Sequence, residues 1–350
     1  MFLGTKNALG IDIGSSYIKS VLLKEAKGSY ELEQFDLHSL SPELIVDGSI
    51  IDSLRLIDSL KEMIKKSRTS TKNAVISISG HSSVIIKKIT LPEMSEEELS
   101  ESIKFEAEQY VPFDIDDVSL DFQILGPKED PGQMDVILVA VKKDVINEYL
   151  TVVKEAGLNP IIVDIDSFAL ENMYGINYEI EPDKNIVLLN IGASAINMSI
   201  LKNGVSVFTR DSSLGSNIHT ESLQREFNLS YENAERLKRG EPVENVTQEN
   251  AQTVIEAASE EILTEIVRSL DYYRSTTLQE EISEIILSGG CALLPNFVSL
   301  VAERAGIETK IAEPFKNIKK SRQIDSVYLE EIAPMMAVAV GLAMRKQGDR

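Results

Sequence analysis

Three short turns of glycine and other small residues could hold a phosphate group. They are Gly14-Ser15-Ser16, Gly192-Ala193-Ser194 and Ser288-Gly289-Gly290. Such turns leave their backbone N–H groups unobstructed, and these donors can wrap a phosphate. Asp12, just before the first turn, could hold a water molecule of a hydrated magnesium ion, and Lys19 could supply a positive charge to the phosphate. The residue types and their spacing therefore indicate nucleotide chemistry.

Each turn taken alone has a structural explanation, because every β-hairpin needs small residues at its turn. The repetition is what favours a binding site. An apolar stretch, a small-residue turn and a second apolar stretch occur at residues 9–23 and again at 186–201. We interpret this as an internal duplication, and the third turn adds to the case for a nucleotide cleft.

The elements that position these turns follow from apolar periodicity. In the first half we expect strands at 9–13, 17–23, 73–79 and 161–165 and helices at 50–64 and 168–174. Between them we expect a compact α/β unit, with strands at 84–89, 118–125 and 135–141 and helices at 95–110 and 143–156. Glu181-Pro182-Asp183 is a polar break that we take as a lobe boundary. In the second half we expect strands at 186–191, 196–201 and 284–287 and helices at 216–227, 230–239, 250–273 and 294–305.

Composition and charge restrict the class of protein and its partners. The chain has 350 residues, enough for two or more lobes. Its 56 acidic and 35 basic residues give a net charge of −21, so we expect no nucleic-acid partner. The only cysteine is Cys291, which excludes an intramolecular disulfide and fits a reducing compartment. Residues 1–10 lack the features of a signal peptide, and no apolar run approaches the roughly 20 residues that span a bilayer, so we expect a cytoplasmic protein.

The three turns, in this order, resemble the two phosphate motifs and the adenosine motif of the superfamily of actin, DnaK-type chaperones and sugar kinases. Residues 12–16 with Lys19 resemble the first phosphate motif, residues 190–194 the second, and residues 287–295 the adenosine motif. The resemblance implies an α/β, actin-like (ribonuclease H-like) fold of two lobes, with ATP and Mg²⁺ between them.

Within that superfamily, four segments look specifically like the PilM family of the FtsA/PilM group: residues 91–94, 105–114, 210–215 and 234–238. The resemblance implies a subdomain 1A at residues 1–82 with 160–183 and 335–350, an inserted subdomain 1C at 83–159, and a second lobe at 184–334. It also implies a cytoplasmic ATP-binding scaffold of the type IV pilus inner-membrane assembly platform. Such a scaffold binds the N-terminal cytoplasmic peptide of PilN beside the inserted subdomain and reaches the inner membrane only through partners. Self-association is left open.

The resemblance also assigns site residues. Those matching nucleotide-binding positions are Asp12, Gly14, Ser15, Ser16, Lys19, Asn190, Gly192, Ala193, Ser194, Gly215, Glu235, Lys238, Gly289 and Gly290. Asp12 would act on magnesium through water, and Asp166 would orient the attacking water. Asn190 departs from the pattern, since many members of the superfamily have an aspartate there. An amide carries no negative charge, so we expect at most a slow ATPase.

Two other functions remain as alternatives. An actin-fold ATPase or a small-molecule kinase would share the cleft, because a fold does not fix a function.

Tethering to lipid in the manner of FtsA would need an amphipathic tail after a linker. Residues 346–350 follow directly on the last expected helix, so we expect no direct lipid binding.

Several conspicuous residues also have structural explanations. His38, His81 and His219 lack metal-ligand spacing, and Cys291 is expected to be a packing residue. In the α/β unit, Tyr110, Val111 and Phe113 are candidates for a groove that binds a partner peptide. The competing assignment of Phe105, Tyr110 and Phe113 is to the core.

Overall fold

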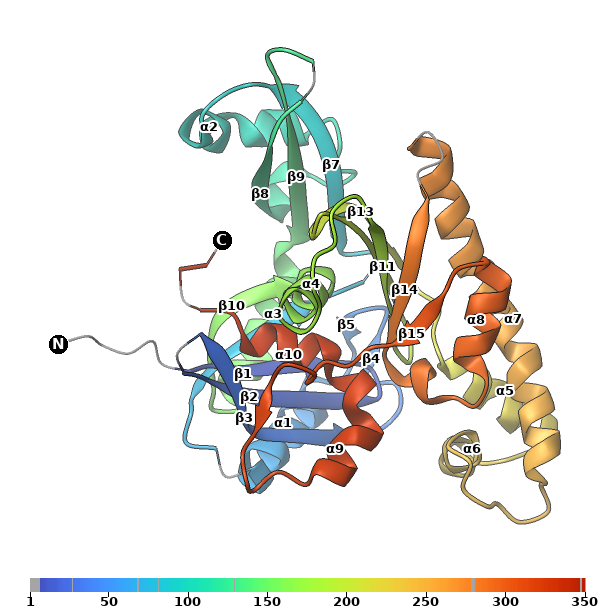
Figure 1. Cartoon of the computed structure of the whole chain (residues 1–350). Coiled ribbons are helices and arrows are strands. Elements are labelled where there is room, and N and C mark those ends of the chain that lie inside the picture. The colour runs from blue at the N-terminus through green and yellow to red at the C-terminus, as the bar shows by residue number, and fades with distance from the viewer. Residues whose placement is uncertain are drawn as a thin grey trace.

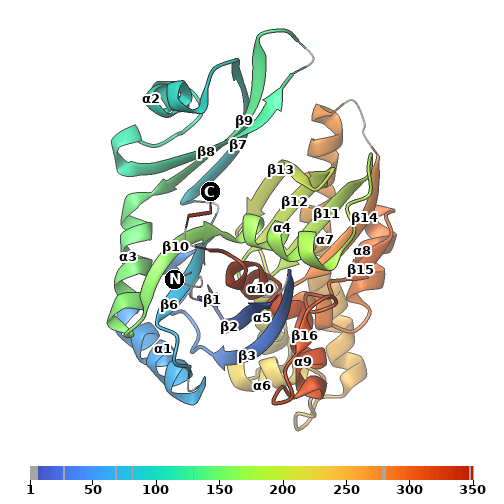
Figure 2. The same ribbon diagram turned by 60° about the vertical axis from the view of Figure 1, so that its left-hand side comes forward.

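A computed structural model of the chain describes residues 7–26, 28–67, 69–80, 82–128, 130–277, 281–346 and 348–349. Two larger sheets form the bodies of two lobes, and a three-stranded sheet projects from the first lobe (Figure 1). Helices α4 (Asp166–Asn177) and α10 (Ala337–Ala343) lie between the two larger sheets (Figure 2). The predicted two-lobe α/β architecture with an inserted unit is therefore present.

The first sheet has the strand order β10–β6–β1–β2–β3–β16. Its strands are β1 (Leu9–Ile13), β2 (Tyr17–Ala26), β3 (Ser29–Ser39), β6 (Asn73–Ile78), β10 (Asn159–Ile165) and β16 (Lys319–Lys320). β2 is antiparallel to β1, whereas β6 runs parallel to β1 and β10 parallel to β6. Every residue of β1 is buried, as expected for a central strand covered on both faces.

The second sheet repeats this arrangement, with the order β13–β12–β11–β14–β15. Its strands are β11 (Asn185–Ile191), β12 (Ile196–Lys202), β13 (Val205–Ser212), β14 (Ile282–Ser288) and β15 (Thr309–Ile311). β12 is antiparallel to β11, whereas β14 runs parallel to β11 and β15 parallel to β14. Because β3–β2–β1–β6–β10 has the same order and directions, the two halves share one topology, as the internal duplication requires.

The other helices of the two lobes pack on these sheets or on one another. They are α1 (Ser53–Ser67), α5 (Asn217–Phe227), α6 (Tyr231–Lys238), α7 (Gln248–Thr276), α8 (Phe297–Ala305) and α9 (Ser326–Ile332). Ser230 caps α6 and Thr247 caps α7, each by accepting a hydrogen bond from a backbone N–H of the first turn. These caps explain why both helices begin close to where the sequence pattern predicted.

The two lobes share one hydrophobic core around α4 and α10. This core contains Val21 and Val75 of the first sheet, Leu188 of the second, and most of α10. Two glycines allow the close packing. A Cβ at Gly341 would lie 1.7 Å from the backbone oxygen of Ala169 on α4, and a Cβ at Gly10 on β1 would lie 2.4 Å from the backbone oxygen of Ala339. The backbones of β1, α10 and α4 are thus in direct contact.

The inserted unit is a small sheet with β9 (Gln133–Lys142) between β7 (Val84–Pro92) and β8 (Val118–Pro127). Helix α2 (Glu96–Ala107) covers one face, and a capping box between Ser95 and Glu98 fixes its start. Helix α3 (Lys143–Glu155) contacts α1 and β10, and its Tyr149 lies in the core of the first lobe. The elements agree with the prediction, and the boundary at 83–159 stays a prediction.

Two features of the fold differ from the sequence analysis. The helix expected at 50–64 begins only at Ser53, and Ile51 and Leu54, apolar residues within the expected range, are 63% and 72% exposed, because Leu56, Leu60 and Met63 fill the core instead. Strands β3, β13 and β15 were not predicted. Edge or near-edge strands carry polar residues at many positions, which weakens their alternation.

The helical stretch Ser326–Ala343 has a mean hydropathy of 1.4 over 18 residues, which is long and apolar enough to cross a membrane by length and composition alone. The sequence analysis did not single it out, since Glu330 and Glu331 interrupt it. Of that stretch, 56% is buried, and α10 within it is buried from end to end. We therefore assign it to the shared core of the two lobes.

Replacing Gly341 by alanine tests the packing of α10 on α4. The new Cβ would overlap the backbone of Ala169, and neither helix can retreat without opening the shared core. We expect G341A to lower the free energy of unfolding, measured by urea denaturation, by roughly 3 kcal/mol. Gly175→Ala on α4 is the control, because a Cβ there meets nothing within 4 Å, and alanine should stabilise that helix by up to about 1 kcal/mol. Equal stability of the two variants would contradict this account of the core.

Candidate nucleotide-binding site

One cleft between the lobes is lined by all three predicted turns. Its lining includes Asp12, Gly14, Ser15, Ser16, Lys19, Asp166, Asn190, Gly192, Ala193, Ser194, Glu235, Lys238, Gly289 and Gly290. Thus every predicted nucleotide-binding residue except Gly215 reaches this cleft, although the residues lie far apart in the sequence. The hairpins β1–β2 and β11–β12 position the first two turns, because the connecting loop of each hairpin lies where the two lobes meet.

The first turn carries a charge pair. Lys19 Nζ donates to Asp12 Oδ2 over 2.9 Å, and both side chains are largely buried. The pairing follows from the hairpin register, which places Asp12 opposite Lys19. A Cβ at Gly14 would lie 2.9 Å from Lys19 Nζ. The absence of a side chain at Gly14 therefore leaves room for Lys19 to reach the turn. The opposite charges of Asp12 and Lys19 compensate each other there.

The two phosphate turns touch each other across the cleft. Ser194 Oγ donates to Ser15 Oγ over 2.8 Å, which joins the second lobe to the first. Gly215 lies behind the second turn, where a Cβ would come within 2.6 Å of the Ala193 backbone. Its predicted contact with a nucleotide remains untested, and its position indicates that it supports the turn from behind.

Asn190 is held by a chain of amides and hydroxyls. Its Nδ2 donates to Asn197 Oδ1 over 3.0 Å, and Asn197 Nδ2 donates to Asp211 Oδ1 over 3.0 Å. Ser288 Oγ donates to Asn190 Oδ1 over 3.3 Å. A carboxylate at position 190 would place one acceptor against another at Asn197. These hydrogen bonds within the second lobe therefore require an amide at position 190. They explain why Asn190 stands where many members of the superfamily have an aspartate.

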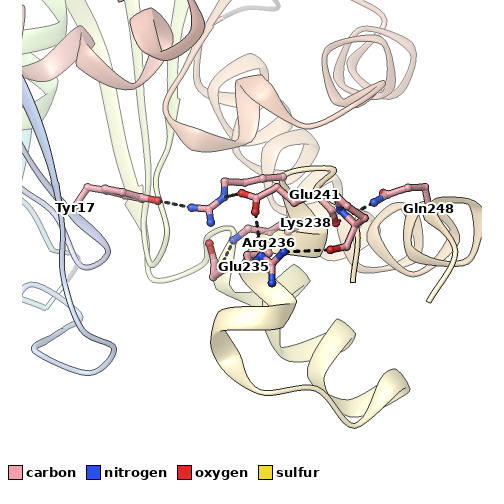
Figure 3. A network of polar contacts seen from close by, with 8 residues as sticks. Tyr17, Glu235, Arg236, Lys238, Glu241 and Gln248 are labelled. Carbon is pink, nitrogen blue, oxygen red and sulfur yellow. Dashed lines mark hydrogen bonds and ion pairs between the residues drawn. The ribbon is translucent and has the colours of Figure 1, made fainter. Parts of the chain in front are cut away.

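Helix α6 forms the opposite wall. Lys238 Nζ donates to Glu235 Oε1 over 2.5 Å and to Thr220 Oγ1 over 2.8 Å. Just after the helix, Arg239 Nη1 donates to the hydroxyl of Tyr17 over 3.0 Å, across the mouth of the cleft. Figure 3 draws this network, with Tyr17 on one side and Glu235, Lys238 and Glu241 on the other. Arg239 Nε also lies 3.2 Å from Glu241 Oε1. Lys238 and Arg239 thus each have a carboxylate partner.

Asp166 lies at the first residue of α4, in the same cleft. Its Oδ1 accepts a hydrogen bond of 2.5 Å from Ser77 Oγ. Burial, followed by the nearby Asp12 carboxylate, raises the pKa of Asp166 to about 7. An acid with this pKa is about half protonated near neutral pH. It can therefore hold a water molecule by accepting or by donating a proton.

Other singled-out residues are structural in the described part of the chain. His219 is buried, with its ring nitrogens 3.2 Å from the Ser216 carbonyl and 3.0 Å from Ser259 Oγ, and burial lowers its pKa to about 4. Cys291 is buried, and that burial raises the pKa of its thiol to about 12. No group of three or more metal-ligating side chains occurs among the residues described. His81 lies outside those residues.

The candidate partner residues lie in the inserted subdomain. Val111 is only 6% exposed, and Tyr110 and Phe113 pack partly buried against the core under α2. Lys142 Nζ lies 4.5 Å above the centre of the Phe113 ring. Phe105, in contrast, is 74% exposed. The core assignment therefore fails for Phe105, and Tyr110 and Phe113 keep a partly open face.

The sequence analysis missed several residues that line the cleft. They are Tyr17, Asp47, Gly48, Ser79, Gly80, Tyr149, Asn197 and Arg239. The pair Asp47-Gly48 has the signature of a tight hairpin turn, but nothing in the sequence indicates that this turn reaches the cleft. Of these residues, Tyr17 has the clearest signal in the sequence, because it directly follows the first phosphate turn.

Comparisons with known proteins agree with this geometry. The family model described as type IV pilus assembly protein PilM matches residues 10–347. Cell division protein FtsA of Bacillus subtilis (strain 168) is 21% identical over 351 residues, covering 87% of this chain and 78% of FtsA. A chain of the solved PilM–PilN type IV pilus biogenesis complex is 28% identical with a TM-score of 0.87, covering 99% of this chain and 100% of that one. MreB5 of Spiroplasma citri bound to ADP, at 15% identity, TM-score 0.52 and coverage of 96% and 95%, shares the fold alone. The predicted actin-like fold is confirmed.

The raised pKa of Asp166 predicts a pH-dependent stability. The unfolded carboxyl titrates near about 4, whereas the pKa in the folded protein is about 7. Between these values the folded state binds a proton that the unfolded state has lost, so the free energy of unfolding falls as the pH rises. Asp166→Asn removes this titration, and its amide oxygen can still accept from Ser77.

We expect Asp166→Asn to gain stability over the wild type by on the order of 1 to 3 kcal/mol between about pH 5 and pH 8, read from urea denaturation at each pH. Asp58→Asn, on the exposed side of α1, serves as the control and should keep the wild-type profile. Parallel profiles for Asp166→Asn and the wild type would show that Asp166 titrates like an exposed acid.

Proposed function

Since the chain belongs to the type IV pilus assembly protein PilM family, we propose that it is an ATP-binding scaffold of the type IV pilus inner-membrane platform that binds the N-terminal cytoplasmic peptide of PilN. The observation that carries this proposal is the match with a chain of the PilM–PilN complex, which extends over nearly the whole of both chains. The match thus includes the inserted subdomain and not only the lobes common to the fold.

The cleft residues fit a nucleotide with magnesium. Gly289 lets the third turn lie directly against the end of β11, since a Cβ there would be 2.3 Å from the Ile191 carbonyl oxygen, and Gly14 leaves room for the Lys19 side chain. Lys19, Lys238 and Arg239 bring three positive charges to the same cleft. Asp12 would hold magnesium through water, because this ion keeps much of its hydration shell in proteins. Phosphate groups would then replace the carboxylates that now pair with the lysines.

A scaffold is favoured over a dedicated ATPase or a small-molecule kinase. Asn190 is fixed as an amide by Asn197 and Ser288, so the second turn offers no carboxylate to a metal. A second turn without a carboxylate weakens metal-assisted attack by water while leaving binding intact. We therefore propose that the bound nucleotide mainly holds the two lobes together.

The chain would reach the inner membrane through its partner. The apolar helical stretch Ser326–Ala343 is part of the shared core of the lobes, and the net charge of −21 opposes direct binding to anionic lipid. A cytoplasmic location beside the membrane follows from binding a peptide of an inner-membrane protein.

We propose the inserted subdomain, with the adjoining face of the first lobe, as the peptide site. Tyr110 and Phe113 keep partly exposed faces there, whereas buried Val111 would contribute only if the subdomain opens. An extended peptide could add to a strand edge through its backbone, with side chains seated against the aromatic rings. In the small sheet, β7 and β8 are the two edges.

Titration calorimetry with Mg·ATP tests the cleft. We expect submicromolar to micromolar binding by the wild type, and Lys19→Ala should weaken it by roughly 1 to 3 kcal/mol, because the variant loses a phosphate contact and leaves Asp12 unpaired. Lys24→Ala on the same strand is the control, since Lys24 pairs with Glu33 in an exposed contact outside the cleft. Phosphate release should stay below about one per second, slower than dedicated enzymes. A wild type that does not bind Mg·ATP rules out the cleft assignment.

Hydrogen exchange tests the peptide site. A synthetic peptide covering the N-terminal cytoplasmic residues of PilN from the same organism should slow amide exchange within residues 83–159 and leave residues 235–240 nearly unchanged, because the cleft need not be occupied. A scrambled peptide of the same composition is the control. Protection confined to residues 184–334 would place the partner site on the second lobe instead.

A further inference from the structure

A tight hairpin from the first lobe reaches into the cleft. Strands β4 (Ile45–Val46) and β5 (Ser49–Ile50) are joined by Asp47 and Gly48. Both turn residues have positive φ, 47° for Asp47 and 74° for Gly48, as in the tightest hairpin turns. The two residues, which we call the hairpin tip, line the cleft together with the phosphate turns. A ligand in the cleft therefore meets this tip.

The hairpin tip packs against the base of the inserted subdomain. A Cβ at Gly48 would lie 2.4 Å from the Ser79 backbone oxygen, and one at Gly80 would lie 3.1 Å from the Asp47 backbone oxygen. The backbone oxygen of Gly80 accepts hydrogen bonds of 3.1 Å from both Ser83 and Val84, where β7 begins. The contact is made between backbone atoms, so no flexible side chain can rearrange to accommodate a movement of the hairpin tip.

The second connection to the inserted subdomain is tied to the same tip. Helix α3 follows β9 and leads back from the subdomain into the first lobe. The hydroxyl of Tyr149 on α3 donates to the Gly48 carbonyl over 3.0 Å, and the Tyr149 side chain is buried. Both chain connections of the inserted sheet thus contact one two-residue turn.

The hairpin tip also contacts the second lobe. Ser213 Oγ donates to Asp47 Oδ1 over 2.5 Å, although 166 positions separate the two residues. Ser213 follows β13, is exposed, and does not belong to the cleft lining. The bond lies between the lobes, so any change in their separation acts on Asp47.

We propose that the hairpin tip couples nucleotide binding to the inserted subdomain. A nucleotide bridging the lobes keeps Ser213 on Asp47, the hairpin tip is then fixed, and its contacts with Gly80 and Tyr149 hold the base of the inserted sheet. The inference rests on the proposed function, because it takes the cleft as a nucleotide site and the inserted subdomain as the partner site. Coupling of this kind is reciprocal, so a partner bound at the subdomain changes nucleotide affinity by the same factor.

The test compares amide exchange with and without saturating Mg·ADP in the wild type and in Ser213→Ala. In the wild type the nucleotide should slow exchange about fivefold or more at residues 82–86 and 143–149, a coupling of the usual size. Ser213→Ala should bind Mg·ADP with an affinity within about threefold of the wild type, because Ser213 lies outside the cleft, and should lose most of the slowing at both segments.

Tyr17→Phe is the matched control, since it removes a different side-chain bond between the lobes, to Arg239, without touching the hairpin tip. At saturating ligand it should keep the slowing at residues 82–86 and 143–149. Equal slowing in Ser213→Ala and the wild type, or equal loss in Tyr17→Phe and Ser213→Ala, overturns the coupling while the nucleotide site stands. A wild type that fails to bind Mg·ADP in calorimetry overturns the proposed function, and this inference with it.

Discussion

The packing of α10 between β1 and α4 is the contact on which the rest of the structure depends. At Gly10 and Gly341 the backbones meet without intervening side chains, and the core formed there contains residues from both large sheets. Because the lobes are joined at this place, their hairpins end on the same side, and the phosphate turns face each other. The cleft thus results from the packing of the two lobes around α10 and α4.

Within the cleft, most of the charge is already compensated. Asp12 pairs with Lys19, and Glu235 pairs with Lys238. Partly buried pairs of this kind avoid the cost of an isolated charge in a region of low dielectric. Asp166 is different, since its hydrogen bond comes from the neutral Ser77 hydroxyl and its pKa rises instead. A nucleotide with magnesium would exchange partners with the paired groups, whereas Asp166 is about half protonated near neutral pH.

The inserted subdomain is more closely linked to the cleft than its projecting position in Figure 1 indicates. Its first connection passes Gly80 and its second passes Tyr149, and both residues line the cleft. The cleft and the base of the inserted subdomain are therefore linked through a few contacts of the hairpin tip. This arrangement suits a scaffold, in which a bound nucleotide stabilises one geometry of the lobes and of the surface offered to a partner.

The sequence by itself determined the elements and the turns, because these depend on local spacing. The strand-turn-strand units at both phosphate turns and the helices α5, α6 and α7 were predicted within a few residues, since each has its own apolar periodicity or cap. The motifs at residues 12–16, 190–194 and 287–295 also carried the family resemblance. The edge strand β13 was missed, because polar residues on an edge weaken the alternation that marks a strand.

Only the tertiary structure decided which residues meet. Tyr17 and Arg239 bond over a separation of 222 positions, and Asp47 and Ser213 over 166. No local pattern predicts such pairs, since they arise only when the two lobes pack against each other. Asn190 meets its partners within one lobe, because Asn197 lies opposite it on the β11–β12 hairpin and Ser288 comes from β14, 98 positions away. Local periodicity fixes elements, whereas the joining of the lobes through α4 and α10 fixes the site.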